Sequence, residues 1–331
     1  MLGFDRSAGH ADRAVRALVL VLVPVVALAA AAFVPNAARA QEELLGTDLP
    51  RRRVEETLET ARATRFRPIG PRRLVFEMRM DAPFDAWFVP ATHDDADGWR
   101  HEIAAYRVAR CLGMDNVPPA VMREIARDEI VARLDPDFED VHDALVARVR
   151  WDDRGMATGA VVFRPGDARP SGLDNPRRLE RRIALLARRA AVDAGRERLV
   201  ADLAHAMLFD YLIAYPARFE GAAVPGTPTG SRLFVTSHAG AFVSPLPAEA
   251  EQALRARLTR VKKLAPAFVE GLTRCDDARL RAELGAGSPA SAPLLLDAHR
   301  TRALLDRRVT VVSWIVALRD AWGADTVLSL P

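Results

Sequence analysis

The sequence predicts an α+β fold made of two lobes, with strands in the first half of the chain and helices in the second. Between residues 73 and 163, apolar side chains recur in short runs bounded by turn residues, as they do in β-strands. From residue 177 onward they recur at helical spacing. A segment rich in proline and glycine, residues 164–176, separates the two patterns and is expected to act as a hinge. Strands followed by helices are typical of the α+β class.

Residues 1–40 have the pattern of a signal peptide. Basic residues precede an apolar run over residues 17–34, and the sequence Ala-Arg-Ala at 38–40 has the A-x-A pattern of a cleavage site. An uncleaved membrane anchor is the alternative, because about 18 apolar residues lie at the lower limit for crossing a bilayer. Either way we expect the folded part to be exported to the periplasm or outside the cell. Membrane contact is expected only if the apolar segment is retained.

The segment 41–73 is polar and rich in arginine, and it is predicted to be a tether with one short helix over residues 54–64. The N-terminal lobe is expected to follow, over residues 74–165. The predicted strands and extended pieces of this lobe are residues 73–80, 86–90, 120–125, 147–151 and 156–163.

One helix, residues 99–112, is expected within the strand-rich lobe. Asp97 is available as its N-cap, and Gly113 stands where helices commonly end in a left-handed residue. Pro118 and Pro119 prevent the helix from continuing. The helix is therefore bounded on both sides by residues suited to its ends.

The helical lobe is expected over residues 166–331. Its predicted helices are residues 177–193, 198–214, 248–272, 278–284 and 294–322. Only residues 232–242 are predicted to form a strand in this half of the chain.

The composition is that of an ordinary globular protein, with 50% apolar and 27% charged residues. The formal net charge is +3, and no basic run is interleaved with aromatic residues. Nucleic acid is therefore not an expected partner.

The two cysteines, Cys111 and Cys275, are too few for a cysteine-rich metal site or a disulfide framework. An oxidising compartment would permit one bridge between them. Cys111 falls on the apolar face of the helix 99–112, so we expect it to be a buried thiol.

Four motifs in a fixed order resemble a group of atypical kinases. They are the helix and turn at 99–119, the apolar helix end at 208–213, the segment within 233–242, and the closing residues 327–331. The group contains secretory-pathway casein kinase-type, HipA-like and phosphatidylinositol 3- and 4-kinase-like proteins, and the closing residues are similar to those of its bacterial branch. The resemblance implies a two-lobed protein-kinase-like fold with an ATP cleft between the lobes.

Three positions depart from the pattern of that group. Val89 stands where the group has a phosphate-binding lysine, and no lysine occurs before Lys262. Ala217 stands where the group has its catalytic aspartate, and Ser237 where it has a metal-binding aspartate. Phosphoryl transfer depends on positioned positive charge and metal, so these losses are expected to remove most of the activity.

Four residues remain as candidate catalytic residues, namely Glu102, Arg218, Glu220 and His238. Each also has a structural interpretation. Glu102 without its lysine is expected to pair with an arginine such as Arg79 or to be solvated. Arg218 is expected to hold the backbone of its loop by hydrogen bonds.

No motif that would orient a nucleophile accompanies His238. Glu220 is the only carboxylate near Ala217 that could replace the lost catalytic acid. Asp210 is expected to brace the loop that follows its helix. Neither a G-x-S-x-G motif nor a zinc-ligand spacing is present, so neither hydrolase chemistry nor a metal site is expected.

These observations favour an exported pseudokinase that acts by binding a protein or an envelope component, without a cofactor. An active phosphotransferase is the first alternative. It would use ATP with Mg or Mn and would hold the metal through Glu220 or Glu102 and the phosphate through an arginine. A structural envelope protein is the second alternative, and it predicts a cleft filled by side chains, whereas an open cleft favours a ligand.

Overall fold

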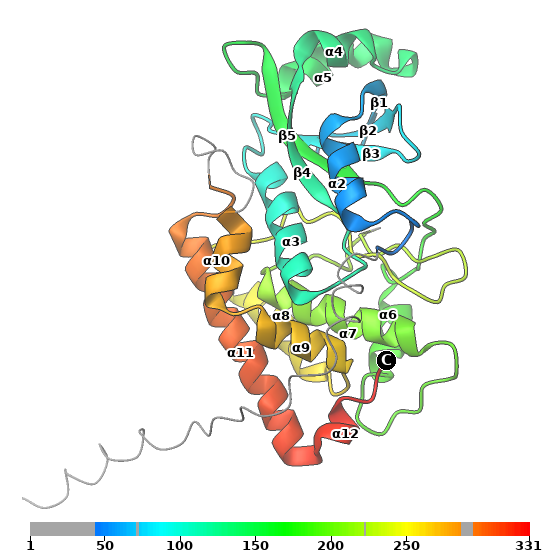
Figure 1. Ribbon diagram of the computed structural model, residues 1–331, viewed down its shortest axis with the longest axis vertical. Helices are drawn as coiled ribbons and strands as arrows, with labels where there is room; N and C mark the ends of the chain where they lie inside the picture. The colour runs from blue at the N-terminus through cyan, green and yellow to red at the C-terminus, as the bar shows by residue number, and fades with distance from the viewer. Residues whose placement is uncertain (1–43, 71–72, 222, 286–293) are drawn as a thin grey trace, which may run out of the picture. The chain divides into compact units, whose positions relative to one another are not determined.

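A five-stranded antiparallel sheet forms the first half of the chain in the computed structural model, which describes residues 44–70, 73–221, 223–285 and 294–331 (Figure 1). The strand order is β1-β2-β3-β5-β4. The strands are β1 (Ala63–Ile69), β2 (Val75–Met80), β3 (Ala86–Pro90), β4 (Ala120–Ala126) and β5 (Met156–Phe163). The predicted signal peptide lies outside the described residues. None of the described helices is long and apolar enough to cross a membrane.

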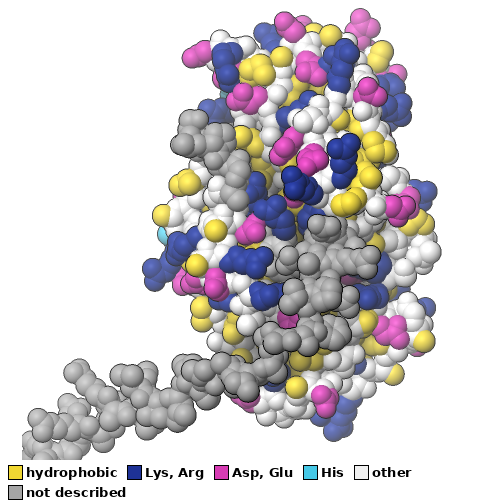
Figure 2. Space-filling model, viewed as in Figure 1, with side chains coloured by type: hydrophobic (Ala, Val, Ile, Leu, Met, Phe, Trp, Pro, Cys, Tyr) yellow, Lys and Arg dark blue, Asp and Glu magenta, His cyan; other side chains and the backbone are white. Residues whose placement is uncertain are grey.

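Aromatic side chains fill the buried face of the sheet. Phe66, Phe76 and Phe88 come from three neighbouring strands and contact one another with ring centroids 6.0 to 6.4 Å apart. Alternate residues of the same strands face the other way, and Val75 and Trp87 are only partly buried there. That second face forms part of a cleft described below. In the face drawn in Figure 2, basic and acidic side chains are interspersed over the sheet half.

The segment 41–73 is not a tether where the structure describes it. Helix α2 (Arg51–Thr60) buries Val54 and Leu58, and β1 pairs with β2 along its whole length. The two apolar side chains are four residues apart, so they lie on one helix face against the sheet. Their pattern is short and is surrounded by arginines, which explains why the sequence suggested a polar linker.

Helix α3 (Gly98–Leu112) has the predicted position and ends at Gly113, whose φ of 76° is left-handed. Asp97 precedes it but makes no capping hydrogen bond through its side chain. Three short elements lie between β4 and β5, and they are α4 (Arg127–Ala132), the 3-10 helix η1 (Pro136–Val141) and α5 (His142–Arg148). The expected extended piece 147–151 is therefore wrong over residues 147 and 148, and only Val149 forms a bridge, with Thr92.

Helices dominate the second half. They are α6 (Pro176–Ala184), α7 (Glu197–Leu212), α8 (Ala248–Arg260), α9 (Pro266–Arg274), α10 (Asp277–Gly285), α11 (Ala298–Trp322) and α12 (Ala324–Val327). The predicted helix 248–272 is two helices, because the chain is extended at Val261 and Pro266 starts a new first turn. The predicted strand 232–242 is irregular. Its backbone turns left-handed at Ser237 and Phe242, with φ of 60° and 57°.

A disulfide between Cys111 and Cys275 joins the end of α3 to the residue after α9, with a Cα–Cα distance of 5.4 Å. Both cysteines are buried, but the expectation of a buried thiol was wrong because the two sulfurs are bonded. Gly271 explains the close approach of the two helices, since a Cβ there would lie 2.0 Å from the carbonyl oxygen of Leu112. A disulfide fits an oxidising compartment and hence export.

Candidate functional site

An open cleft of about 740 Å³ lies between the sheet and the helical half. Apolar side chains of the sheet form one wall, namely Ile69, Val75, Trp87, Val89 and Val162. Residues 164–174 border it as the chain crosses from one half to the other, and residues 236–239 lie opposite the sheet. The volume is within the range of small-molecule sites. The prediction of a filled cleft is therefore wrong, and the structural-protein alternative loses its main support.

Two of the three departing positions line this cleft. The alkyl side chain of Val89 faces it from β3, where the resemblance implies a lysine. Ser237 is exposed at the opposite side. Ala217 is not among the residues that line the cleft. The cleft therefore has an apolar group and a hydroxyl at two positions where the resemblance implies an ammonium and a carboxylate.

Glu102 lines the cleft from α3 and is bound by residues of the helical half. Its carboxylate accepts a hydrogen bond from the Ala239 N–H at 2.8 Å and lies 3.2 Å from His238 Nδ1. Burial alone would raise the pKa of Glu102, but the hydrogen bonds from His238 and the backbone outweigh burial and lower that pKa. An ionised Glu102 therefore fastens α3 to residues 238 and 239.

A second contact reinforces this attachment, because His101 Nδ1 lies 3.0 Å from the carbonyl oxygen of Ala239. The expected pairing of Glu102 with Arg79, or its solvation, is wrong. Arg79 is exposed on β2 and stands opposite Arg65 of β1. Glu102 is itself buried at 5% exposure.

The surroundings of His238 disfavour its charged form and lower its pKa. Burial lowers the pKa of its imidazole, and the nearby charge of Arg218 adds to that effect, while Glu102 opposes it. Nδ1–H then donates to Glu102, and Nε2 is buried without a hydrogen-bond partner in the part of the chain that the structure describes. The ring packs edge-on against Phe209 at 5.7 Å. His238 does not line the cleft, so the geometry gives it a positioning contact and no proton-transfer path to a ligand.

Arg218 and Asp210 form an ion pair at 2.8 Å, and both side chains are fully buried. Arg218 also donates to the carbonyl oxygen of Thr236 and lies 4.4 Å from the centre of the Tyr215 ring. Burial raises the pKa of Asp210 to about 6, although Arg218 opposes the rise. The expected bracing roles of both residues are confirmed, because they connect the loop after α7 to the segment before Ser237.

Glu220 is exposed, and its side chain makes no hydrogen bond or ion pair within the described residues. It does not line the cleft, although its neighbour Gly221 does. The active-enzyme alternative predicts carboxylates gathered around a metal. Among the described residues, no group of three or more His, Cys, Asp or Glu side chains could hold a metal ion.

Sequence reasoning missed three arginines that line the cleft, namely Arg73, Arg164 and Arg169. Arg73 pairs with Asp95 at 2.7 Å, and its guanidinium lies beside Gly240. Arg164 lies 3.4 Å from Glu77 and 3.5 Å from Asp85 at the end of β5. Because the chain has many arginines, the sequence positions of these three gave no signal that would distinguish them from the rest.

Replacing Glu102 with alanine is expected to lower the free energy of unfolding by about 1–3 kcal/mol. The substitution leaves the buried Ala239 N–H and the His238 ring without their acceptor, and an unsatisfied buried donor costs about that much. Urea denaturation at pH 7 measures the change. Glu59→Ala, at an exposed position of α2, is the matched control, and equal stability of the two variants would contradict the proposed attachment of α3.

Comparison with known proteins gives similarity at the level of fold. The structure is similar to that of a Golgi casein kinase with Mn and ADP bound, with a TM-score of 0.62, 16% sequence identity, and coverage of 84% of this chain and 78% of the other. It is also similar to hydra Fam20 with sugar, with a TM-score of 0.61, 15% identity, and coverage of 88% and 97%. No family model and no curated protein matches.

The position of the cleft agrees with this similarity. It lies between a five-stranded antiparallel sheet and a helical half, and the segment after β5 crosses from one half to the other. The chain thus has the kinase-like fold of the Fam20 secretory-pathway kinases, at low sequence identity.

Proposed function

We propose that this chain is an exported pseudokinase that acts by binding and does not transfer phosphoryl groups. The contact that carries the proposal is the capture of Glu102 by His238 and Ala239. In active kinases the corresponding glutamate holds a lysine that contacts the nucleotide phosphates. Here Val89 offers no ammonium, and the carboxylate is bound instead to the segment opposite the sheet.

The charges expected of phosphoryl transfer are missing on the other side of the cleft as well. Ser237 offers one neutral hydroxyl in place of a carboxylate, which is a poor ligand for a hard divalent cation. Ala217 can neither accept a proton nor orient a hydroxyl. Because the reaction depends almost wholly on positioned charge and metal, these differences favour a protein without catalytic activity.

Binding remains possible because the cleft is open. Its sheet side is apolar, and Arg73, Arg164 and Arg169 are among the residues that line it. Such a site suits a small molecule with an apolar body and an anionic group. Secretory-pathway kinases have the same fold, and the disulfide and the predicted signal peptide support an exported role, with the partner a protein or an envelope component.

Two measurements test the proposal. The purified protein is incubated with γ-labelled ATP and either Mg²⁺ or Mn²⁺, and we expect neither labelled protein nor released phosphate above the background without protein. Thermal unfolding under the same conditions is expected to show no rise in Tm that depends on the metal, because a ligand raises Tm only when it binds the native state.

Glu220→Gln separates the two enzymatic interpretations. The position is exposed, so the substitution is expected to leave the fold intact. Metal-dependent transfer of γ-phosphate that this variant loses would overturn the pseudokinase proposal and support the alternative with relocated ligands.

A further inference from the structure

An arginine-rich surface follows the segment that crosses between the two halves. Residues 177–198, which include most of α6 and the chain leading into α7, contain eight arginines and three acidic residues. We call this segment the arginine patch. Seven of its arginines are exposed and Arg182 is partly buried. The patch has a larger excess of positive charge than the whole chain, whose formal net charge is +3.

The acidic residues of the arginine patch are too few to pair with most of its arginines. Glu180 pairs with Arg260 at 3.1 Å, Asp193 with Arg196 at 3.1 Å, and Glu197 accepts the Gly195 N–H at 2.7 Å. The arginines with no acidic partner among the described residues include Arg177, Arg181, Arg182, Arg189 and Arg198.

Several of these guanidinium groups are close enough to repel one another. Burial lowers the pKa of Arg182, and the charges of Arg196, Arg178 and Arg181 lower it further. Like charges gathered on a surface destabilise the free protein. An anionic partner would relieve that repulsion.

A small pocket of about 130 Å³ opens beside the patch. Arg182 and Thr227 lie at this pocket, and the apolar side chains of Leu173, Leu199 and Leu203 line it. Cavities of about 150 Å³ accommodate one benzene ring, so this pocket suits a single apolar side chain.

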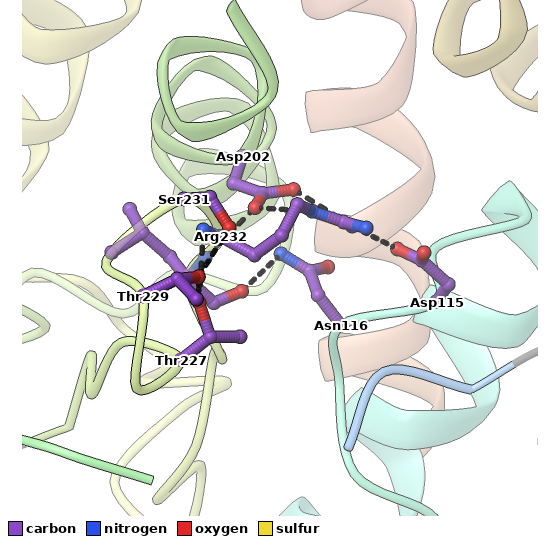
Figure 3. Close-up of polar contacts among 8 residues, drawn as sticks. Asp115, Asn116, Asp202, Thr227, Thr229, Ser231 and Arg232 are labelled. Atoms are coloured by element: carbon purple, nitrogen blue, oxygen red, sulfur yellow. Dashed lines mark hydrogen bonds and ion pairs between the residues drawn. The ribbon is translucent and has the colours of Figure 1, made fainter. Parts of the chain in front are cut away.

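Hydrogen bonds connect one wall of this pocket to neighbouring segments. Arg232 donates to Asp202 at 2.8 and 3.1 Å and to Asp115 at 2.7 Å, and Leu233 N–H donates to Asp202 at 2.8 Å (Figure 3). Asn116 also donates to the carbonyl oxygen of Leu233 at 3.0 Å. These bonds come from α7, from the turn after α3 and from the irregular segment between α7 and α8 (Figure 3). The pocket is therefore preformed, which reduces the ordering cost of binding.

We propose that the arginine patch and the adjacent pocket bind an acidic protein segment that carries one apolar side chain. The arginines complement carboxylates, and the pocket takes the apolar anchor. An acidic polysaccharide offers no such anchor. The acyl chain of a lipid is much larger than the pocket, so a protein segment fits both features best.

The docking surface is separate from the proposed ligand site but adjoins it. Pro170 and Ser171 line both the small pocket and the large cleft. A protein segment bound in the small pocket would therefore contact Pro170 and Ser171, which also border the large cleft. The proposal goes beyond the pseudokinase proposal and does not depend on whether the cleft takes a ligand.

Fluorescence anisotropy with synthetic peptides tests this surface. The probes are labelled eleven-residue peptides of Asp and Glu with a central Phe, Leu, Tyr or Trp, and the same peptide with a central Ala. We expect binding by at least one probe with an apolar centre, and about tenfold weaker binding by the alanine peptide. Arg181→Glu/Arg182→Glu is expected to weaken binding about tenfold or more, and raised salt to weaken it further.

Arg52→Glu/Arg53→Glu reverses two exposed charges on α2 and is the matched control, which is expected to bind like the unchanged protein. Unchanged Tm values establish that all variants are folded. Absence of binding by every probe would overturn the proposal. Equal binding by the alanine peptide, by polyglutamate or by vesicles of anionic phospholipid would also overturn it, because it would indicate a non-specific polyanion surface.

Discussion

Replacing Arg218 with methionine is expected to lower the free energy of unfolding by about 3–5 kcal/mol at pH 8. Both members of the Asp210–Arg218 pair are fully buried, and removal of one partner from such a pair leaves an uncompensated charge. The Thr236 carbonyl group and the Tyr215 ring also lose their contact with the guanidinium. Urea denaturation followed by circular dichroism measures the loss.

The loss should depend on pH in a defined direction. The pKa of Asp210 is about 6 in the folded protein, above the ordinary value of a carboxyl group. A raised folded pKa gives a contribution to stability that is full at low pH and is lost as the pH rises through that pKa. Without Arg218 the carboxyl group takes up a proton more readily. The variant is therefore expected to be less destabilised at pH 5 than at pH 8.

Two variants control this experiment. Arg52→Met removes an exposed arginine that pairs with Glu56, and it is expected to change stability by less than about 1 kcal/mol. Asp210→Leu/Arg218→Met removes both buried charges, and it is expected to be more stable than Arg218→Met alone. If Arg218→Met were as stable as Arg52→Met, the pair would not be the brace inferred here.

The elements predicted best from sequence are those with strong local signals. The strands β3 and β5 have the predicted bounds. Helix α3 begins one residue earlier than predicted, and its predicted end is correct because Gly113 determines it locally. The short helix predicted over residues 54–64 overlaps α2, whereas β1 was not predicted, because its few apolar side chains stand among arginines. Residues 232–242 were misassigned because their left-handed turns at Ser237 and Phe242 depend on contacts made by other parts of the chain.

The resemblance to the kinase group implied a cleft between two lobes but did not give the contacts around it. Val89, Glu102 and Ser237 line one cleft, whereas Ala217, Arg218, Glu220 and His238 are not among its lining residues. The partner of Glu102 could not be predicted, because His238 is 136 positions away along the chain and reaches the carboxylate only after the turn at Ser237. Long-range geometry of this kind is absent from the local pattern of residues.

The disulfide also joins residues that are far apart along the chain, so local sequence patterns could not predict it. Its removal is expected to have a large effect on stability. Cys111→Ser/Cys275→Ser is expected to lower the free energy of unfolding by about 2–5 kcal/mol, because the bond closes a loop with a sequence separation of 164 and so restricts the unfolded chain. Dithiothreitol should reduce the stability of the unchanged protein to that of the variant and should not affect the variant. If the two proteins were equally stable under oxidising conditions, the bond would not contribute to stability.

The disulfide also bears on the cleft, because α3 carries Glu102 as well as Cys111. The disulfide joins the C-terminal end of α3 to the residue after α9. Glu102, in the first half of α3, binds residues 238 and 239. If both attachments hold the helix, Glu102→Ala should cost more stability in the reduced protein than in the oxidised one, because energies of coupled contacts are not additive. Urea denaturation of the unchanged protein and of Glu102→Ala, each with and without dithiothreitol, measures that coupling. Purely additive losses would indicate that the two attachments act independently.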